Sequence, residues 1–145
     1  MFKHVLLPTD GSKLSEKSVK QGIRLAKSLN ARVTALHVIP KFHTFTYETE
    51  MLEVTRGEYE HASEKRADEF LRTVKKIAAN AGVECDTLHA SSDQPYEEII
   101  KTAKKKDCDL ILMASHGRRG LQSLLLGSET QKVLTHSKVP VLVYR

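Results

Sequence analysis

Apolar residues along this chain follow two alternating patterns, which predict strands alternating with helices. Short continuous apolar runs have the length of buried strands, and between them apolar residues recur every three or four positions, as in amphipathic helices. The runs that predict strands cover residues 2–7, 32–39, 83–90, 109–114 and 139–144. The run at 83–90 is more polar than the others, so we expect it at an edge of the sheet.

Residues that favour helix starts and stops mark the boundaries between these runs. Either Ser12 or Ser15 can cap the first helix, whose end is marked by Asn30. Gly82 is a suitable stop for a long second helix, and Pro95 favours the start of a third. The four expected helices lie between Ser12 and Asn30 and over residues 58–81, 95–106 and 128–136.

Two stretches interrupt the alternation. Residues 8–12 combine proline, aspartate, glycine and serine, so we expect a turn that ends the first strand at Leu7. Residues 41–56 have no clear period, and we expect a long loop that is either functional or mobile.

The order strand-helix-strand, repeated to the end, predicts an α/β fold. Such alternation requires a parallel sheet with helices on both faces. A length of 145 residues fits one domain over residues 1–145, with no linker or internal repeat to indicate a second. We therefore expect a single doubly wound open sheet of five parallel strands with four helices.

Composition narrows the possible partners. The chain has 23 Lys and Arg against 18 Asp and Glu, a net charge of +5, which weakly favours anionic ligands. The cations are scattered along the sequence, and Lys104-Lys105-Lys106 comes at the end of an expected helix, where cations suit the dipole. Since few aromatic residues are available to stack on bases, we expect no nucleic acid partner.

Other features bear on compartment and on metals. Cys85 and Cys108 have neither CxxC spacing nor a disulfide framework, which favours a reducing compartment. We expect no signal peptide, because residues 1–7 are too short for one and run directly into the fold, and no apolar run approaches ~20 residues, the length of a membrane span. The histidines lack the spacing of metal ligands. We expect a cytoplasmic protein with no membrane partner and no protein-bound metal site.

The stretch from Met113 to Thr130 has the order strand, glycine loop, helix start. Gly117 and Gly127 bracket nine residues, and Ser128 opens the expected last helix. Glycines allow a ligand to approach the backbone, and a helix N-terminus offers unpaired N–H groups and partial positive charge to a phosphate. The hydroxyls of Ser128 and Thr130 could also donate. A strand-helix connection that merely needs glycines would have the same spacing, so both interpretations stay open.

These residues also carry a family resemblance. Ala114-x2-Gly117-x9-Gly127-Ser128 resembles the nucleotide signature Gly-x2-Gly-x9-Gly-Ser/Thr of the universal stress protein family, with Ala114 in place of the first glycine. Residues 7–12 and 139–144 resemble that family's first and last strands, and the resemblance covers essentially the whole chain. It implies strand order 3-2-1-4-5. In such a sheet, the chain leaves two neighbouring strands in opposite directions at one point, and ligands bind there.

The resemblance implies ATP as the ligand, accompanied by Mg²⁺, and a homodimer through the last strand, Val139 to Tyr144. It implies that Asp10 accepts from ribose hydroxyls, although Asp-Gly is also a turn pair, and that the Val38 backbone contacts adenine. The methyl group of Ala114 could weaken binding if it faces the ribose, and the Glu129 carboxylate could do so if it points toward the phosphates and not toward solvent. The candidate nucleotide-binding residues are Pro8, Thr9, Asp10, Val38, Met113, Ala114, His116, Gly117, Arg118, Gly127, Ser128, Glu129 and Thr130.

No catalytic residue is expected. His116 has no triad partner that can be identified from spacing, and Arg118 and Arg119 are either phosphate contacts or solvated loop cations. With no general base evident, hydrolysis would be slow at most. The family resemblance implies a dimeric stress-response and signalling module. The alternative is the family's other class, which binds no nucleotide and acts through protein partners. An adenylate-transferring enzyme would need a second motif, which is not found.

Overall fold

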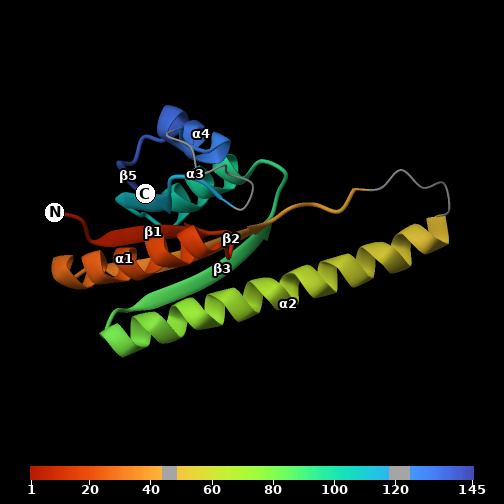
Figure 1. The fold of residues 1–145 in the computed structure, drawn as a ribbon, viewed down its shortest axis with the longest axis horizontal. Coiled ribbons are helices and arrows are strands. Elements are labelled where there is room, and N and C mark those ends of the chain that lie inside the picture. Colours follow the sequence, from red (N-terminus) through yellow and green to blue (C-terminus); the bar gives the residue numbers. More distant parts are fainter. Residues whose placement is uncertain (44–48, 118–124) are drawn as a thin grey trace.

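The computed structural model of the chain describes residues 1–43, 49–117 and 125–145. Strands and helices alternate along it from end to end (Figure 1). The strands are β1 (His4–Thr9), β2 (Arg32–Ile39), β3 (Cys85–Ser91), β4 (Leu110–Ala114) and β5 (Val141–Tyr144). The helices are α1 (Lys13–Leu29), α2 (Thr49–Ala81), α3 (Pro95–Lys105) and α4 (Ser128–His136). No helix in the described part of the chain is long and apolar enough to span a membrane.

All five strands are parallel, in the order β3-β2-β1-β4-β5. Both the predicted fold class and the strand order implied by the family resemblance are confirmed. The polar strand β3 lies at one edge, as expected, and β5 lies at the other. Helices α1 and α2 cover one face of the sheet, and α3 and α4 cover the other.

Alternation of side chains along each strand divides the core into two layers. Residues of β1 illustrate this, because Val5 and Leu7 pack toward α1 and α2 whereas Leu6 packs toward α3 and α4. A strand covered on both faces is apolar at consecutive positions, which is why the central strands read as continuous runs in the sequence.

Capping residues explain the bounds of α1 and the end of α2. The Ser12 hydroxyl accepts a hydrogen bond from the Ser15 N–H at 3.2 Å, so Ser12 is the N-cap. Asn30 ends α1 in the left-handed conformation (φ 53°), and Gly82 follows α2 with φ 73°. Ser15 has a different role, because its hydroxyl donates to Thr9 Oγ1 at 2.7 Å in the core.

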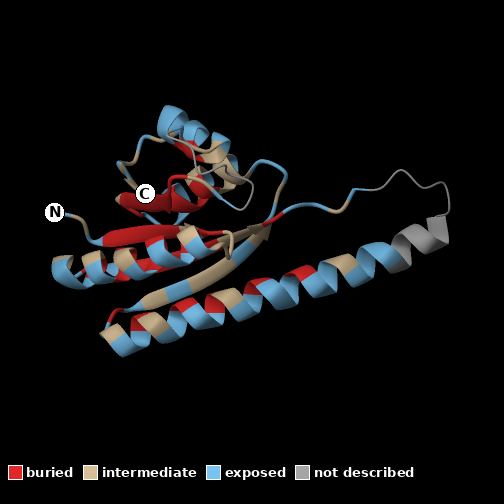
Figure 2. Cartoon of the chain, in the orientation of Figure 1, coloured by how far each residue is buried: buried red, intermediate tan, exposed pale blue. Residues whose placement is uncertain are grey.

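Helix α2 begins at Thr49, so the loop expected over residues 41–56 is wrong in its second half, while residues 44–48 lie outside the described part of the chain. The helix extends beyond the sheet at its N-terminal end (Figure 1). Figure 2 shows buried positions along α2 from Ser63 onward, and none over residues 55–62. A helical segment that buries few of its side chains needs no continuous apolar stripe, so periodicity cannot reveal it.

Strand β1 also continues past its expected end at Leu7. Pro8 and Thr9 stay in register with Leu36 and His37 of β2. Proline has no N–H to donate, so it is tolerated where a strand keeps only one neighbour. The remaining boundaries differ from the expected ones by at most two residues, which is normal for element ends.

His4 is a buried titratable group in β1. Its side chain is 4% exposed, and Nε2 lies 2.7 Å from Thr34 Oγ1. Burial lowers the pKa of His4 below 6.5, and the charge of Arg32 lowers it further. The folded protein therefore holds this imidazole neutral at pH values where the unfolded chain protonates it.

We expect His4 to make the free energy of unfolding fall as the pH drops below about 6.5, because the unfolded state then binds a proton that the folded state does not. Above about pH 6.5 the contribution of His4 to the free energy of unfolding is fully present. Urea unfolding of wild type and His4→Gln between about pH 8 and pH 5 measures it. The stability difference between the two proteins should shrink toward low pH. Parallel pH profiles of two proteins that are folded at neutral pH would contradict the assignment.

Candidate functional site

The neighbouring strands β1 and β4 diverge at the centre of the sheet. β1 is in register with β4 at Val5 and Leu6, and Pro8 lies beyond this pairing. The chain leaves β1 for α1 on one face and leaves β4 toward α4 on the other. This is the switch point of a doubly wound sheet, where ligands bind beyond the carboxyl ends of the strands.

Two hydrogen bonds fix the first turn of α4 at this point. The Gly127 N–H donates to the Ser115 carbonyl at 2.7 Å, and the Thr130 hydroxyl donates to the Ala114 carbonyl at 2.9 Å. Thr130 is buried, so its hydroxyl hydrogen is already used within the fold. The N–H groups of the first three residues from Ser128 have no acceptor inside the helix, as at every helix start. They supply partial positive charge at the switch point.

Both glycines of the motif lie against other parts of the site. A Cβ on Gly127 would come within 2.9 Å of His116 Cα and 3.3 Å of the Ser115 carbonyl oxygen. The φ of Gly127 is −61°, so the requirement is for space and not for an unusual backbone conformation. A Cβ on Gly117 would collide with Asp10 Oδ2. The loop after β4 therefore touches the loop after β1.

The loop after β1 is held by its own side chains. Asp10 Oδ1 accepts from the Ser12 N–H at 2.9 Å, so the turn-stabilising role of this aspartate is observed. Thr9 Oγ1 accepts from the Ser15 hydroxyl, and the Thr9 carbonyl lies 2.8 Å from His37 Nδ1 on β2. These contacts position the Asp10 carboxylate beside the motif of β4.

A family model of the universal stress proteins matches residues 1–145. The chain belongs to the universal stress protein family. It is 34% identical to universal stress protein MJ0531 of Methanocaldococcus jannaschii, covering 100% of this chain and 83% of that protein. It is 33% identical to YxiE of Bacillus subtilis, covering 100% of both chains.

Solved structures of universal stress proteins are similar to this chain. The structure of MJ0577 from M. jannaschii is 32% identical to the chain, covers 99% of it and 95% of its own length, and has a TM-score of 0.85. Two structures of more distant universal stress proteins, one with cAMP and one from Archaeoglobus fulgidus with dAMP, share the fold. The cAMP complex is 21% identical, covers 99% of this chain and 97% of its own, and has a TM-score of 0.67. The dAMP complex is 17% identical, covers 100% of this chain and 98% of its own, and has a TM-score of 0.65.

The other candidate residues of this universal stress protein lie around the same edge of the sheet. Val38 is half-buried at the end of β2, and Met113 is buried in β4, both on the α3 side. His116 Nδ1 lies 3.0 Å from the Ser115 hydroxyl. Arg118 lies outside the described residues. The structure thus brings Asp10 to Gly117, His116 to Gly127 and Ala114 to Thr130.

Glu129 is directed away from the place expected for phosphates. Its Oε2 accepts a hydrogen bond from the Tyr96 N–H at 2.9 Å. Tyr96 is in the first turn of α3, whose own N-cap, Gln94, makes no side-chain capping bond. The Glu129 carboxylate therefore caps a neighbouring helix, and its Oε1 lies 3.3 Å from Lys132 Nζ. The expectation that Glu129 could repel a bound phosphate is not supported by this orientation.

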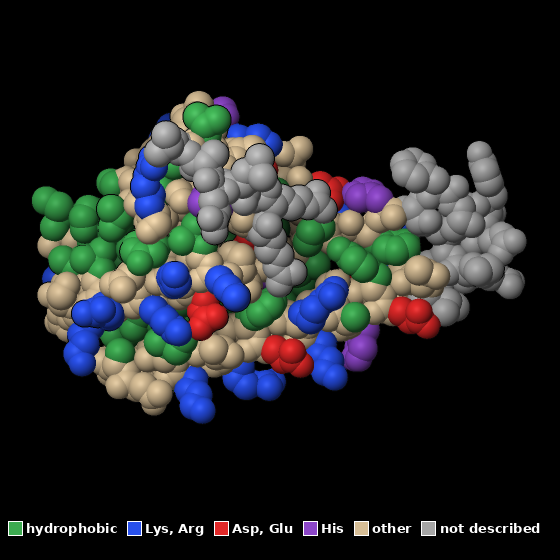
Figure 3. Space-filling model, viewed as in Figure 1, with side chains coloured by type: hydrophobic (Ala, Val, Ile, Leu, Met, Phe, Trp, Pro, Cys, Tyr) green, Lys and Arg blue, Asp and Glu red, His purple; other side chains and the backbone are tan. Residues whose placement is uncertain are grey.

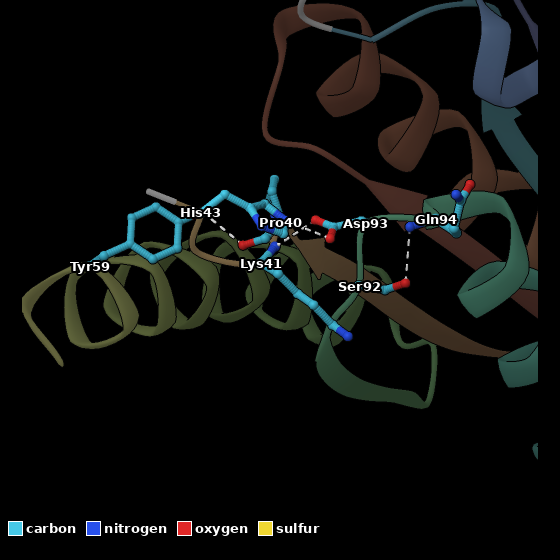
Figure 4. A network of polar contacts seen from close by, with 7 residues as sticks. All are labelled: Pro40, Lys41, His43, Tyr59, Ser92, Asp93 and Gln94. Carbon is cyan, nitrogen blue, oxygen red and sulfur yellow. Dashed lines mark hydrogen bonds and ion pairs between the residues drawn. The ribbon is translucent and has the colours of Figure 1, made fainter. Parts of the chain in front are cut away.

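Sequence reasoning missed a polar network at the ends of β2 and β3 (Figure 4). Asp93 accepts from the Lys41 N–H at 3.1 Å and lies 2.6 Å from His43 Nε2, so it ties the segment after β2 to the loop after β3. The hydrogen bond to His43 is the main cause that lowers the pKa of Asp93. Tyr59 of α2 donates to the Pro40 carbonyl at 2.8 Å.

This network borders a cavity of about 460 Å³ between α2 and the ends of β2 and β3, lined in part by Phe42, Tyr59, Glu64 and His89. It opens on the α2 side of the sheet, whereas Val38 and Met113 lie on the α3 side. Within the described residues, no three His, Cys, Asp or Glu side chains are arranged to hold a metal ion. In the sequence, the aromatic and histidine residues of the aperiodic stretch 41–56 were the feature from which this cavity could have been predicted.

The capping role of Glu129 has a measurable consequence. Glu129→Ala leaves the N-terminus of α3 without its acceptor, so we expect the free energy of unfolding to fall by about 1 kcal/mol, the usual cost of losing a cap. Lys132→Ala is the matched control, because it removes a partly exposed ion pair and the contact of the Lys132 ammonium with the Tyr96 ring (5.4 Å) but leaves the Glu129 hydrogen bond to the Tyr96 N–H, so it should cost less than Glu129→Ala. Urea unfolding measures both. Equal losses in the two variants would show that Glu129 acts through Lys132 and not through Tyr96.

Proposed function

We propose that this universal stress protein binds an adenine nucleotide, ATP with Mg²⁺, at the switch point of its sheet. The observation that carries the proposal is the meeting of two loops there. Gly117, from the loop after β4, lies against Asp10, from the loop after β1, and the N-terminus of α4 is anchored to the same end of β4. A carboxylate and a set of unpaired N–H groups are thus close together.

The phosphates would lie at the N-terminus of α4. The Ser128 side chain is exposed, and the N–H groups of Ser128, Glu129 and Thr130 begin the helix. A helix start suits an anion because of these N–H groups and the helix dipole. Hydrogen bonds to a charged group contribute roughly 1.5–3 kcal/mol each, so three or four are enough for micromolar affinity, about −8 kcal/mol.

The nucleoside would lie between the ends of β1, β2 and β4. Asp10 would accept from ribose hydroxyls, and the Val38 backbone, near the end of the strand next to β1, would contact adenine. Universal stress proteins of the same fold are described in complex with cAMP and with dAMP, which supports an adenine nucleotide as the ligand class. The Mg²⁺ would bridge phosphate oxygens, as is usual for this ion.

Hydrolysis of the bound nucleotide would be slow. The titratable candidates near α4 already have structural partners, since Asp10 accepts from Ser12, Glu129 caps α3, and His116 lies 3.0 Å from the Ser115 hydroxyl. None is arranged as a general base toward a water molecule in the described residues. We infer a signalling module in the cytoplasm whose output depends on nucleotide occupancy and not on turnover.

A second function has its own support. The Thr130 hydroxyl is used within the fold, and the backbone of His116 already requires a glycine at position 127. Both features of the motif thus have a structural reason without a ligand, and Ala114 replaces the motif's first glycine. A family member that binds no nucleotide and acts through protein partners is the alternative.

The protein would act as a homodimer through its last strand. β5 is an edge strand, and Leu142 on it is 45% exposed. Leu134 of α4 and Leu125 are also exposed, at 41% and 74%. An apolar edge strand has unpaired backbone groups that favour pairing with another chain. A two-fold axis through β5 would place the same residues of two copies opposite each other.

The site predicts different effects for two neighbouring substitutions. Gly127→Val adds a branched side chain against His116 and should abolish ATP binding. Ser128→Ala removes a hydroxyl and keeps the N–H groups, so it should weaken binding by about 1.5–3 kcal/mol, or roughly ten- to a hundredfold. Calorimetry with ATP and Mg²⁺ measures both affinities.

Circular dichroism must first show that both variants are folded, because Gly127 also has a packing role. Ser128→Ala is the decisive variant if Gly127→Val does not fold, since the Ser128 side chain is exposed. Wild-type affinity in Ser128→Ala would place the phosphates elsewhere. No heat from the wild-type protein with ATP and Mg²⁺ would favour the function through protein partners.

Assembly is tested at Leu142, the most exposed residue of β5. Leu142→Lys introduces like charges at a two-fold contact and should convert a dimer into a monomer, whereas Val141 packs on the core and is a poorer test. Sedimentation velocity at tens of micromolar, on the order of a moderate dimer's dissociation constant, measures the change. A wild-type protein that is monomeric under these conditions would refute the dimer.

A further inference from the structure

Helix α1 carries a straight row of cations on its outer side. The row consists of Lys13, Lys17, Lys20, Arg24 and Lys27. Their spacing alternates between four and three residues, which places successive side chains next to each other on one ridge of a helix. All five are exposed, and the buried residues of α1 lie on its opposite side. At 1.5 Å per residue the row is about 21 Å long.

The end of α2 adds to this charge. Residues 71–81 contain Arg72, Lys75 and Lys76, all exposed, and no acidic residue. Because α1 and α2 pack on the same face of the sheet, these cations and the row on α1 belong to one outer layer. Figure 3 shows Lys and Arg gathered over these helices. Glu16 is the one acidic residue within 13–29 and 71–81.

The other helical layer has no such imbalance. Helices α3 and α4 carry four lysines, Lys101, Lys104, Lys105 and Lys132, against three glutamates, Glu97, Glu98 and Glu129. The excess of cations therefore lies on α1 and the end of α2 and does not extend over the whole layer, since residues 49–70 of α2 carry seven acidic residues against three cations.

Folding accounts for only part of the row on α1, since Lys27 lies in the last turn of the helix, where a cation suits the dipole. Lys13 is the first residue of the helix, where a cation opposes the dipole. Like charges three and four residues apart also destabilise a helix. Lys20 is paired with Glu16 at 2.8 Å, while the other four members have no ion pair with any described residue. An arrangement that weakens the isolated helix indicates an external partner.

We propose that the row on α1 is a docking surface for an acidic segment of another protein. A helix with carboxylates at the same alternating spacing repeats its charges at the same interval as the row. If such a helix lay along α1, each of its carboxylates would lie opposite one cation of the row, as charged residues that flank the contact do between paired helices. Complementary charge of this kind selects the partner and speeds its encounter.

The surroundings of the row favour a protein over a bilayer or a nucleic acid. Glu64, Asp68 and Glu69 are exposed on α2 just before Arg72, so a wide anionic plane would also meet acidic side chains. No large hydrophobic side chain is exposed on α1 or on the described part of α2 to enter a bilayer. The row has no aromatic side chain to stack on bases.

The test uses two synthetic helical peptides of equal length and charge. One carries five glutamates at the alternating spacing, and the other distributes them around the helix. We expect the first to bind more tightly in fluorescence anisotropy at low salt, with affinity falling as salt is added. The double variant Lys17→Glu and Arg24→Glu should weaken it by roughly tenfold or more. The control, Lys101→Glu with Lys104→Glu on α3, makes the same change in net charge and should have an effect of about twofold at most.

Thermal unfolding verifies that both double variants fold, and all four substituted residues are exposed. Equal affinity for the two peptides, or equal loss in the two double variants, would overturn the proposal, because binding would then follow net charge alone. A DNA duplex or phosphatidylserine vesicles that bind more tightly than the peptide, with loss only in the α1 variant, would assign the row to a nucleic acid or a membrane. No binding of the peptide would also overturn it.

Discussion

The anchoring of α4 to the end of β4 is the constraint on which the rest of the site depends. The bonds from the Gly127 N–H to the Ser115 carbonyl and from the Thr130 hydroxyl to the Ala114 carbonyl return the chain to the strand it left. They direct the helix start toward the gap between the diverging strands. Without them, the unpaired N–H groups of α4 would have no fixed relation to Asp10. The same geometry explains why position 127 has no room for a side chain.

The loop after β1 is held from the opposite layer. Gly11 has a φ of 77°, and the ring of Phe70 on α2 fills the space that its Cβ would occupy. His37 lies 5.7 Å from Phe70 between ring centroids and contacts the Thr9 carbonyl. Helix α2 therefore supports the turn that carries Asp10, while α4 supports the glycine motif. The site forms where two separately supported loops meet.

Much of the fold could be predicted from the sequence because its signals are local. Continuous apolar runs and capping residues gave the strands and the exact bounds of α4, whereas the strand order rested on the family resemblance. The early start of α2 was missed because a helix that projects past the sheet needs no apolar stripe. The directions of side chains could not be predicted from the sequence either. Glu129 caps α3 through Tyr96, a contact between residues 33 positions apart, and no spacing rule indicates it.

The most direct test of the central claim is an NMR titration of the protein with ATP and Mg²⁺, since it reports both binding and location. We expect the largest shifts at the amides of Asp10, Val38 and Gly117 and in the first turn of α4. A cavity between α2 and the ends of β2 and β3 offers a distinct alternative location. Shifts confined to its lining residues, such as Phe42 and Tyr59, or no shifts at millimolar ATP, a concentration well above a micromolar dissociation constant, would contradict the account.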